Sequence, residues 1–167
     1  AGTVSATGTL TASDVDANAT RSWSLQGTPS TTYGSMAIDA STGIWTYTLD
    51  NTKDATQALK EGQTVTQTYT ARVTDDFGAY VDQTITVTIN GTNDVPVITN
   101  NAAARAGTVI EAGHNDDGTV VAGTVSATGT LTASDVDANA TRSWSLQGSP
   151  STTYGSMAID ASTGIWT

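Results

Sequence analysis

Alternation of polar and apolar side chains is the clearest pattern along this chain. Between residues 64 and 90, positions held mostly by Val, Ile, Tyr and Ala alternate with positions rich in Thr. Successive side chains of a β-strand point to opposite faces of its sheet, so this pattern predicts strands with one buried face. The turn sequence Asp75–Gly78 separates the two alternating runs, which together predict an antiparallel hairpin.

Shorter runs nearer the N-terminus follow the same two-residue period. They predict strands over 3–12, 21–26, 33–39 and 44–49, separated by turns rich in Gly, Ser and Thr. A short helical pattern covers 50–62, with Asp54 as a candidate N-cap. About seven short strands in one domain predict an all-β fold, an antiparallel β-sandwich. Its core is expected to contain Trp23, Trp45, Tyr47 and Tyr69.

The chain also repeats itself. Residues 122–167 match residues 1–46 at 45 of 46 positions, and the one difference is Thr28 against Ser149. The period of 121 residues is that of a whole small domain, since the turns of a solenoid repeat about every 20–50 residues. We therefore expect tandem repeats of one β-sandwich domain.

The repeat predicts the domain organisation. A first β-sandwich repeat over 1–92 lacks its N-terminal strand, 93–106 is a junction or linker, and 107–167 begins a second, truncated repeat. By the period, the strand that completes the first repeat should resemble residues 107–121. A sheet without that strand exposes an edge and a groove, which an extended segment can fill.

Charge and composition argue against several classes of function. The chain has 16 acidic and 6 basic residues, a net charge of −10. This balance argues against binding to nucleic acid or to an anionic membrane, because both require basic surfaces, and it suits cation binding or plain solubility. Cys is absent, which excludes disulfides and thiolate chemistry. No apolar run approaches 18 residues, so we expect no membrane insertion.

Several motifs in combination resemble a known family. GTLTASDVDA, the hairpin end WTYTLDN, the turn QALKEG and the closing TVTINGTND are similar to the VCBS repeat, over nearly all of the first copy and over the second as far as it extends. The resemblance implies a cadherin- or immunoglobulin-like sandwich, repeated in long arrays in bacterial surface adhesins and biofilm proteins. The chain departs from the family at Gly113–Thr124, which is longer than the usual short acidic turn.

Acidic and amide side chains gather in the predicted turns. The D-x-D segment at Asp14 and Asp16 is not an EF-hand, because Ala19 and Leu25 stand where that loop needs Gly and Glu. Calcium takes roughly six to eight oxygen ligands, mainly from carboxylates, amides and backbone carbonyls. The alternative is that these residues only stabilise turns, as Asp and Asn commonly do.

The resemblance implies a cadherin-like calcium clamp. In cadherins, an Asn-Asp before a Pro, a D-x-D loop of the next repeat and acidic residues of the previous one hold calcium between neighbouring repeats. A divalent ion there turns the repulsion among carboxylates into attraction and stiffens the joint. Such extracellular sites bind weakly, with a Kd of about 10⁻⁴–10⁻³ M. The candidate ligands are Asp14, Asp16, Glu61, Asp75, Asp76, Asn93, Asp94, Glu111, Asp135 and Asp137.

Three functional hypotheses remain open. The first is a structural extender module of a long extracellular bacterial adhesin or biofilm protein, secreted to the cell surface, with neighbouring repeats of the same chain as partners and calcium at the joints. The second is a fibre-forming subunit, in which copies exchange β-strands. The third is a glycan-binding module, for which Tyr33 and Tyr80 are the candidate exposed aromatics.

We do not expect an enzyme. The chain has one histidine, His114, in a polar loop, and no Ser-His-Asp set can be assembled within one repeat. No catalytic residue is therefore assigned from the sequence.

Overall fold

The computed structural model describes residues 4–167, so Thr3 of the predicted first strand lies outside the described part. The protein is nearly all-β, with 36% strand and 4% helix, and its sheets are antiparallel. The chain forms two compact units. Unit 1 comprises Ala1–Asp94 with Val136–Ala138, and unit 2 comprises Val95–Asp135 with Asn139–Thr167. Each unit is described by itself below.

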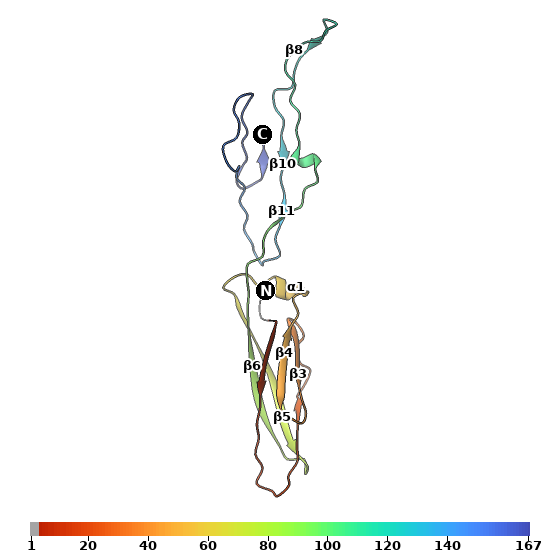
Figure 1. Cartoon of the computed structure of the whole chain (residues 1–167), viewed down its shortest axis with the longest axis vertical. Coiled ribbons are helices and arrows are strands. Elements are labelled where there is room, and N and C mark those ends of the chain that lie inside the picture. The colour runs from red at the N-terminus through yellow and green to blue at the C-terminus, as the bar shows by residue number, and fades with distance from the viewer. Residues whose placement is uncertain (1–3) are drawn as a thin grey trace. The chain divides into compact units, whose positions relative to one another are not determined.

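Unit 1 contains two three-stranded antiparallel sheets, ordered β1-β4-β3 and β2-β5-β6 (Figure 1). The strands are β1 (Ser5–Thr9), β2 (Arg21–Leu25), β3 (Gly34–Ile38), β4 (Ile44–Leu49), β5 (Thr64–Asp75) and β6 (Tyr80–Asn90). They confirm the strands expected from the two-residue period. The hairpin of β5 and β6 is paired from Thr64 opposite Asn90 to Thr74 opposite Tyr80, with its turn where the sequence predicts one.

The buried core joins the two sheets. Its side chains come from both sheets and from the segment after α1, and this two-layer arrangement is consistent with a β-sandwich. The buried cluster is Trp23, Met36, Tyr47, Leu59, Tyr69, Ala71, Ile85, Val87 and Ile89. The predicted core residues Trp23, Tyr47 and Tyr69 are confirmed, whereas Trp45 is only half-buried at the margin of this cluster.

A short helix, α1 (Asp54–Gln57), follows β4. The expectation that Asp54 caps it is wrong, because Asp54 is already helical and Lys53 occupies the N-cap position. The backbone carbonyl of Lys53 accepts the first helical hydrogen bonds, from the N–H groups of Thr56 and Gln57, so the helix begins one residue earlier than the side-chain pattern indicates.

Hydrogen-bonded polar groups lie within the core of unit 1. The Tyr47 hydroxyl donates to Gln67 Oε1 at 2.8 Å, and the Tyr69 hydroxyl lies 3.0 Å from the same oxygen. Gln67 Nε2 in turn donates to Ser30 Oγ at 2.8 Å. Because Gln67 is 92% buried, these bonds replace those it would make with water. They connect β4, β5 and the loop before β3.

Unit 2 is built from short two-stranded pairings. β7 pairs with β11, β8 with β9, and β10 with β12, all antiparallel. Their bounds are β7 (Val97–Ile98), β8 (Gly113–His114), β9 (Val120–Val121), β10 (Gly129–Thr130), β11 (Ala133–Ser134) and β12 (Ile165–Trp166), with the 3-10 helix η1 at Ala103–Arg105. The pairing of Gly129 with Trp166 reproduces that of Gly8 with Trp45 in unit 1.

The core network leads to a test of stability. In a Tyr47→Phe variant, the hydroxyl that bonds Gln67 is lost while the ring remains, so the free energy of unfolding should fall by about 1 kcal/mol. Urea denaturation followed by circular dichroism measures this change. A Tyr154→Phe variant, whose ring is fully exposed, should match the parent protein. Equal stability of all three proteins would contradict a structural role for the network.

Candidate functional site

Two of the predicted calcium ligands meet within unit 1. The backbone N–H of Asp94 donates to Asp137 Oδ2 at 3.0 Å, and the N–H of Ala138 donates to the carbonyl of Ala58 at 3.1 Å. The side chain of Asp137 is buried, with only 7% of the residue exposed. Burying a carboxylate is costly unless hydrogen bonds compensate, and a backbone amide is a strong donor for that purpose. The structure therefore joins the predicted junction to the predicted D-x-D loop at Asp94 and Asp137.

Three other predicted ligands bond to their own turns. Asp14 accepts from the N–H of Asp16 at 3.0 Å. Asp75 accepts from the N–H groups of Phe77 and Ala79 at 2.9 and 2.8 Å, and so closes the turn between β5 and β6. Asn93 Nδ2 donates to the carbonyl of Asp94 at 2.7 Å. These are the short-range bonds by which Asp and Asn stabilise turns.

The remaining predicted ligands are spread over both units. Glu61, Asp76 and Glu111 are exposed, and Asp135 is half-buried. Among residues 4–167, no three His, Asp or Glu side chains lie close enough together to hold one metal ion. Any calcium bound at Asp94 and Asp137 would therefore take further oxygens from backbone carbonyls, amides or water.

The most strongly hydrogen-bonded carboxylates were not among the predicted ligands. Asp39 Oδ1 accepts from the N–H and hydroxyl of Thr42 at 2.7 and 2.8 Å, and from the N–H and hydroxyl of Ser41 at 3.0 and 2.8 Å. These bonds, those from Thr42 first, lower the pKa of Asp39 to about 2. Asp160 repeats the arrangement in the second copy, and its pKa is likewise lowered to about 2. The sequence Asp-Ala-Ser-Thr-Gly indicates a turn but not this set of bonds.

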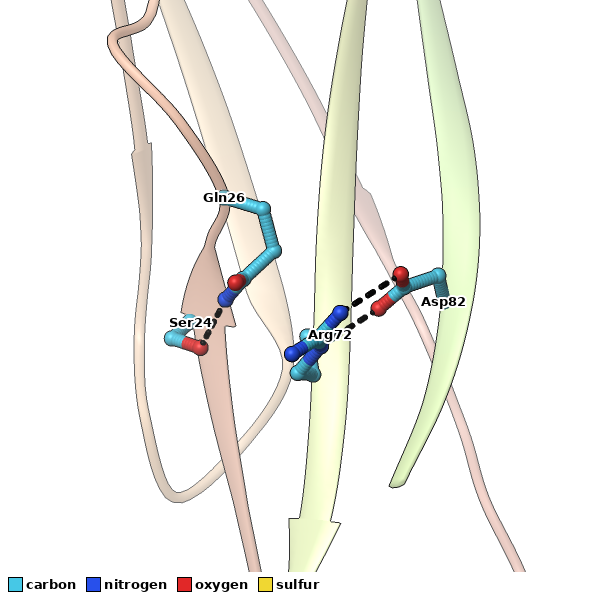
Figure 2. Close-up of polar contacts among 4 residues, drawn as sticks. All are labelled: Ser24, Gln26, Arg72 and Asp82. Atoms are coloured by element: carbon cyan, nitrogen blue, oxygen red, sulfur yellow. Dashed lines mark hydrogen bonds and ion pairs between the residues drawn. The ribbon is translucent and has the colours of Figure 1, made fainter.

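An ion pair lies on the outer face of the β2-β5-β6 sheet. Figure 2 shows the Arg72 guanidinium facing the Asp82 carboxylate, with Nε–Oδ1 and Nη2–Oδ2 distances of 2.7 and 2.8 Å. These bonds from Arg72 lower the pKa of Asp82. The Arg72 Cζ atom also lies 3.6 Å from the ring centroid of Tyr80. The sequence pattern does not predict this ion pair, because the pair depends on the register of β5 and β6, which places the two residues opposite each other.

The aromatic candidates for glycan binding are both engaged by the protein. Tyr33 is half-buried and packs against the core cluster. Tyr80 is 57% exposed, but Arg72 lies over its ring. Arg72 therefore covers one face of the Tyr80 ring.

Two hollows lie between β1 and β6, the edge strands of the two sheets. The larger, of about 810 Å³, is lined by Thr9–Val15, Trp23 and Tyr80–Val81. The smaller, of about 570 Å³, is lined by Val4–Ala6 and by Val87–Thr92.

No protein-family model and no curated protein sequence matches this chain. None of the helices formed by residues 4–167 has the length and apolar character needed to span a membrane.

The bonded aspartates lead to a prediction about pH. A carboxylate with a lowered pKa in the folded state stabilises the fold above its unfolded value of 3.8, and this contribution is lost as pH falls towards about 2. An Asp39→Ala variant should therefore be less stable than the parent at pH 6 and approach it at pH 2. Urea denaturation across this range measures the difference. Asp76→Ala, at an exposed turn position, is the matched control, and a pH-independent gap for Asp39→Ala would contradict the argument.

Proposed function

We propose that this chain is part of a tandem array of cadherin- or immunoglobulin-like sandwiches of the VCBS type, which serves as a spacer in a large adhesin or biofilm protein on the bacterial cell surface. The observation that carries the proposal is the match of 45 of 46 residues at a period of 121. The antiparallel sheets and the core shared by two of them support it.

Near-identity between copies favours a mechanical role. A site that recognises one target is needed once, whereas a spacer repeats one unit because each unit adds the same length and stiffness. The same local contacts recur in both copies, including the Asp39 and Asp160 turns and the crossing of Trp45 and Trp166 over Gly8 and Gly129. The partners of each unit are then the neighbouring repeats of its own chain.

The surface of the chain suits this role as well. Outward-facing strand positions carry mostly Thr, Ser, Asn and Gln, and the net charge is −10. A polar surface of one charge sign keeps a concentrated array of units soluble and separate.

We also propose that calcium binds weakly where Asp94 and Asp137 meet. The donor set is suited to this ion, since calcium prefers carboxylate and carbonyl oxygens, and the Asp137 carboxylate is held by the Asp94 amide. When bound, calcium would supply positive charge to a buried carboxylate. The residues of the chain hold this loop against the carbonyl of Ala58 and fix the position of Asp137.

Thermal unfolding with calcium and with excess chelator tests the calcium site. At calcium about tenfold above its Kd, mass action adds about 1.4 kcal/mol to the stability, which raises the melting temperature by several degrees. An Asp137→Ala variant should lose this calcium-dependent shift. Asp16→Ala is the matched control, because Asp16 occupies the same position in the first copy but is exposed, and it should keep the shift.

The two parts of the proposal fail separately. Equal melting temperatures of the parent with and without millimolar calcium would show that calcium does not bind at Asp94 and Asp137. The spacer role would not be affected by that result. Antibodies against the chain should label intact cells of the source organism without permeabilisation. Labelling only after permeabilisation would contradict the surface role, and this result does not depend on whether calcium binds.

A further inference from the structure

A five-residue sequence, Asp-Ala-Asn-Ala-Thr, stands at the same turn in both copies of the repeat. It covers residues 16–20 and 137–141, and its central asparagines are Asn18 and Asn139. The triplet Asn-x-Thr is the acceptor sequence for N-linked sugars, which bond to the side-chain amide of the asparagine. A third triplet of this kind begins at Asn90. Because Thr is abundant in this chain, the triplet alone does not identify an acceptor, and its surroundings decide.

The asparagine of each pentapeptide lies in a left-handed turn. Asn18 has a φ of 62° and Asn139 a φ of 58°, and both are exposed. Asparagine adopts this region more readily than most other non-glycine residues. In the first copy the N–H of Ala19 donates to the carbonyl of Asp16 at 3.3 Å, which places Asn18 at the third position of a four-residue turn. Both asparagines therefore lie at exposed turns outside the strands.

The groups that take part in sugar transfer are accessible in both copies. No hydrogen bond within residues 4–167 involves the side chain of either asparagine, or that of the threonine two positions after it, Thr20 or Thr141. Both threonines are exposed. A transferase has to bring the amide nitrogen to the sugar while it contacts the threonine hydroxyl, so both groups must be open to it. The two turns meet this requirement.

Asn90, in contrast, is held in the sheet. It is the last residue of β6 and pairs with Thr64, whose hydroxyl donates to Asn90 Oδ1 at 3.2 Å. The N–H of Gly91 donates to the carbonyl of Gln63 at 2.8 Å, and a Cβ atom at Gly91 would collide with the carbonyl oxygen of Leu59. The middle residue of this triplet is thus packed against backbone, and a transferase has no room to enclose it.

An aspartate two positions before the asparagine also separates the pentapeptide from the third triplet. Asp16 and Asp137 stand there in the two copies, whereas Thr88 stands two positions before Asn90. A carboxylate gives a transferase a second group to bind, because an arginine holds it with two hydrogen bonds. Asp16 is exposed, but Asp137 is buried and accepts a bond from the N–H of Asp94. The two identical pentapeptides therefore differ in the accessibility of this carboxylate.

We propose that Asn18 and Asn139 are acceptor sites for an N-linked glycan, attached by a transferase that binds the aspartate two positions before and the threonine two positions after. The donor is a sugar activated as a diphosphate ester. The amide nitrogen Nδ2 forms a bond to the anomeric carbon, and the bond from that carbon to the phosphate oxygen breaks. The diphosphate leaves with the electron pair, and Nδ2 gives up one proton to a base of the transferase. Nothing is oxidised or reduced.

The position of Asp137 sets the order of events. The transferase needs this carboxylate, so the sugar is attached before Asp137 bonds to Asp94. Asn139 is exposed once that bond has formed, so the folded chain has room for the attached sugar. One glycan per 121 residues then adds a bulky polar group at the same turn of each repeat. Glycosylation at these sites goes beyond the spacer role, which requires no modification.

A purified system tests the acceptor. Trypsin cleaves after Arg21, Arg72, Arg105 and Arg142, so the three triplets fall on the separate peptides 1–21, 73–105 and 106–142. The folded 167-residue chain is incubated with a lipid-linked oligosaccharide and a bacterial oligosaccharyltransferase that requires an acidic residue two positions before the asparagine, then digested for mass spectrometry. Peptide 1–21 should carry the sugar, and 106–142 should not, because Asp137 is buried. Peptide 106–142 released by trypsin before the reaction should carry it.

Variants identify the groups that the transferase reads. Thr141→Ala should abolish modification of the released peptide 106–142, whereas Thr141→Ser, which keeps the hydroxyl, should not. Asp16→Ala, at an exposed position, should abolish modification of peptide 1–21 in the folded chain. Peptide 73–105 is the matched control and should stay unmodified, folded or released. Thr88→Asp should turn only the released form into an acceptor, because Asn90 stays paired in the fold.

The native protein gives the deciding result. Peptide 106–142 prepared from the source organism should carry a sugar on Asn139. An unmodified peptide there, or an unmodified peptide 1–21 after reaction of the folded chain with the transferase, would overturn the proposal. Modification of 106–142 within the folded chain would overturn the order of events. The reaction with purified components does not depend on where the chain is located, so its failure is distinct from failure of the surface role.

Discussion

The packing of an indole ring across a glycine determines much of this structure. In unit 1 the ring of Trp45 lies over Gly8, and a Cβ atom there would be 2.7 Å from the ring. Trp166 lies over Gly129 in the same way. Because the neighbouring strand has no side chain at that point, the indole crosses it and reaches the edge of the sheet. The contact places the indole of Trp45 against the margin of the core cluster, where it is half-buried.

The rest of the core depends on a few large side chains. Aromatic residues make up only 6% of the chain, yet Trp23, Tyr47 and Tyr69 are among the buried cluster. Tyrosines in such a core bring hydroxyl groups that need partners, and Gln67 serves both of them. This explains why a glutamine occupies an inward-facing position of β5, where the alternating pattern would place an apolar residue.

Local patterns were enough to predict the strands but not the sites. The period of two residues identified β5 and β6, because their buried faces carry apolar residues at nearly every second position. The same two-residue rule overestimated the burial of Trp45. Alternation shows which face of the sheet a side chain points to, but it does not show whether other residues cover that face. The ion pair of Arg72 and Asp82 depends on register, which alternation alone does not fix. The acidic turns could be found from the sequence, but which of their residues meet depends on tertiary structure. Here the backbone N–H of Asp94 donates to the Asp137 carboxylate.

Near-identical repeats bring a risk as well as a mechanical advantage. A strand of one repeat fits the same place in every other repeat, so the choice of partner depends on local concentration and not on sequence. A strand tethered beside its own repeat has a high effective concentration there and displaces the equivalent strands of other molecules. Correct strand pairing in such an array therefore depends on the tethering of each strand to its own repeat.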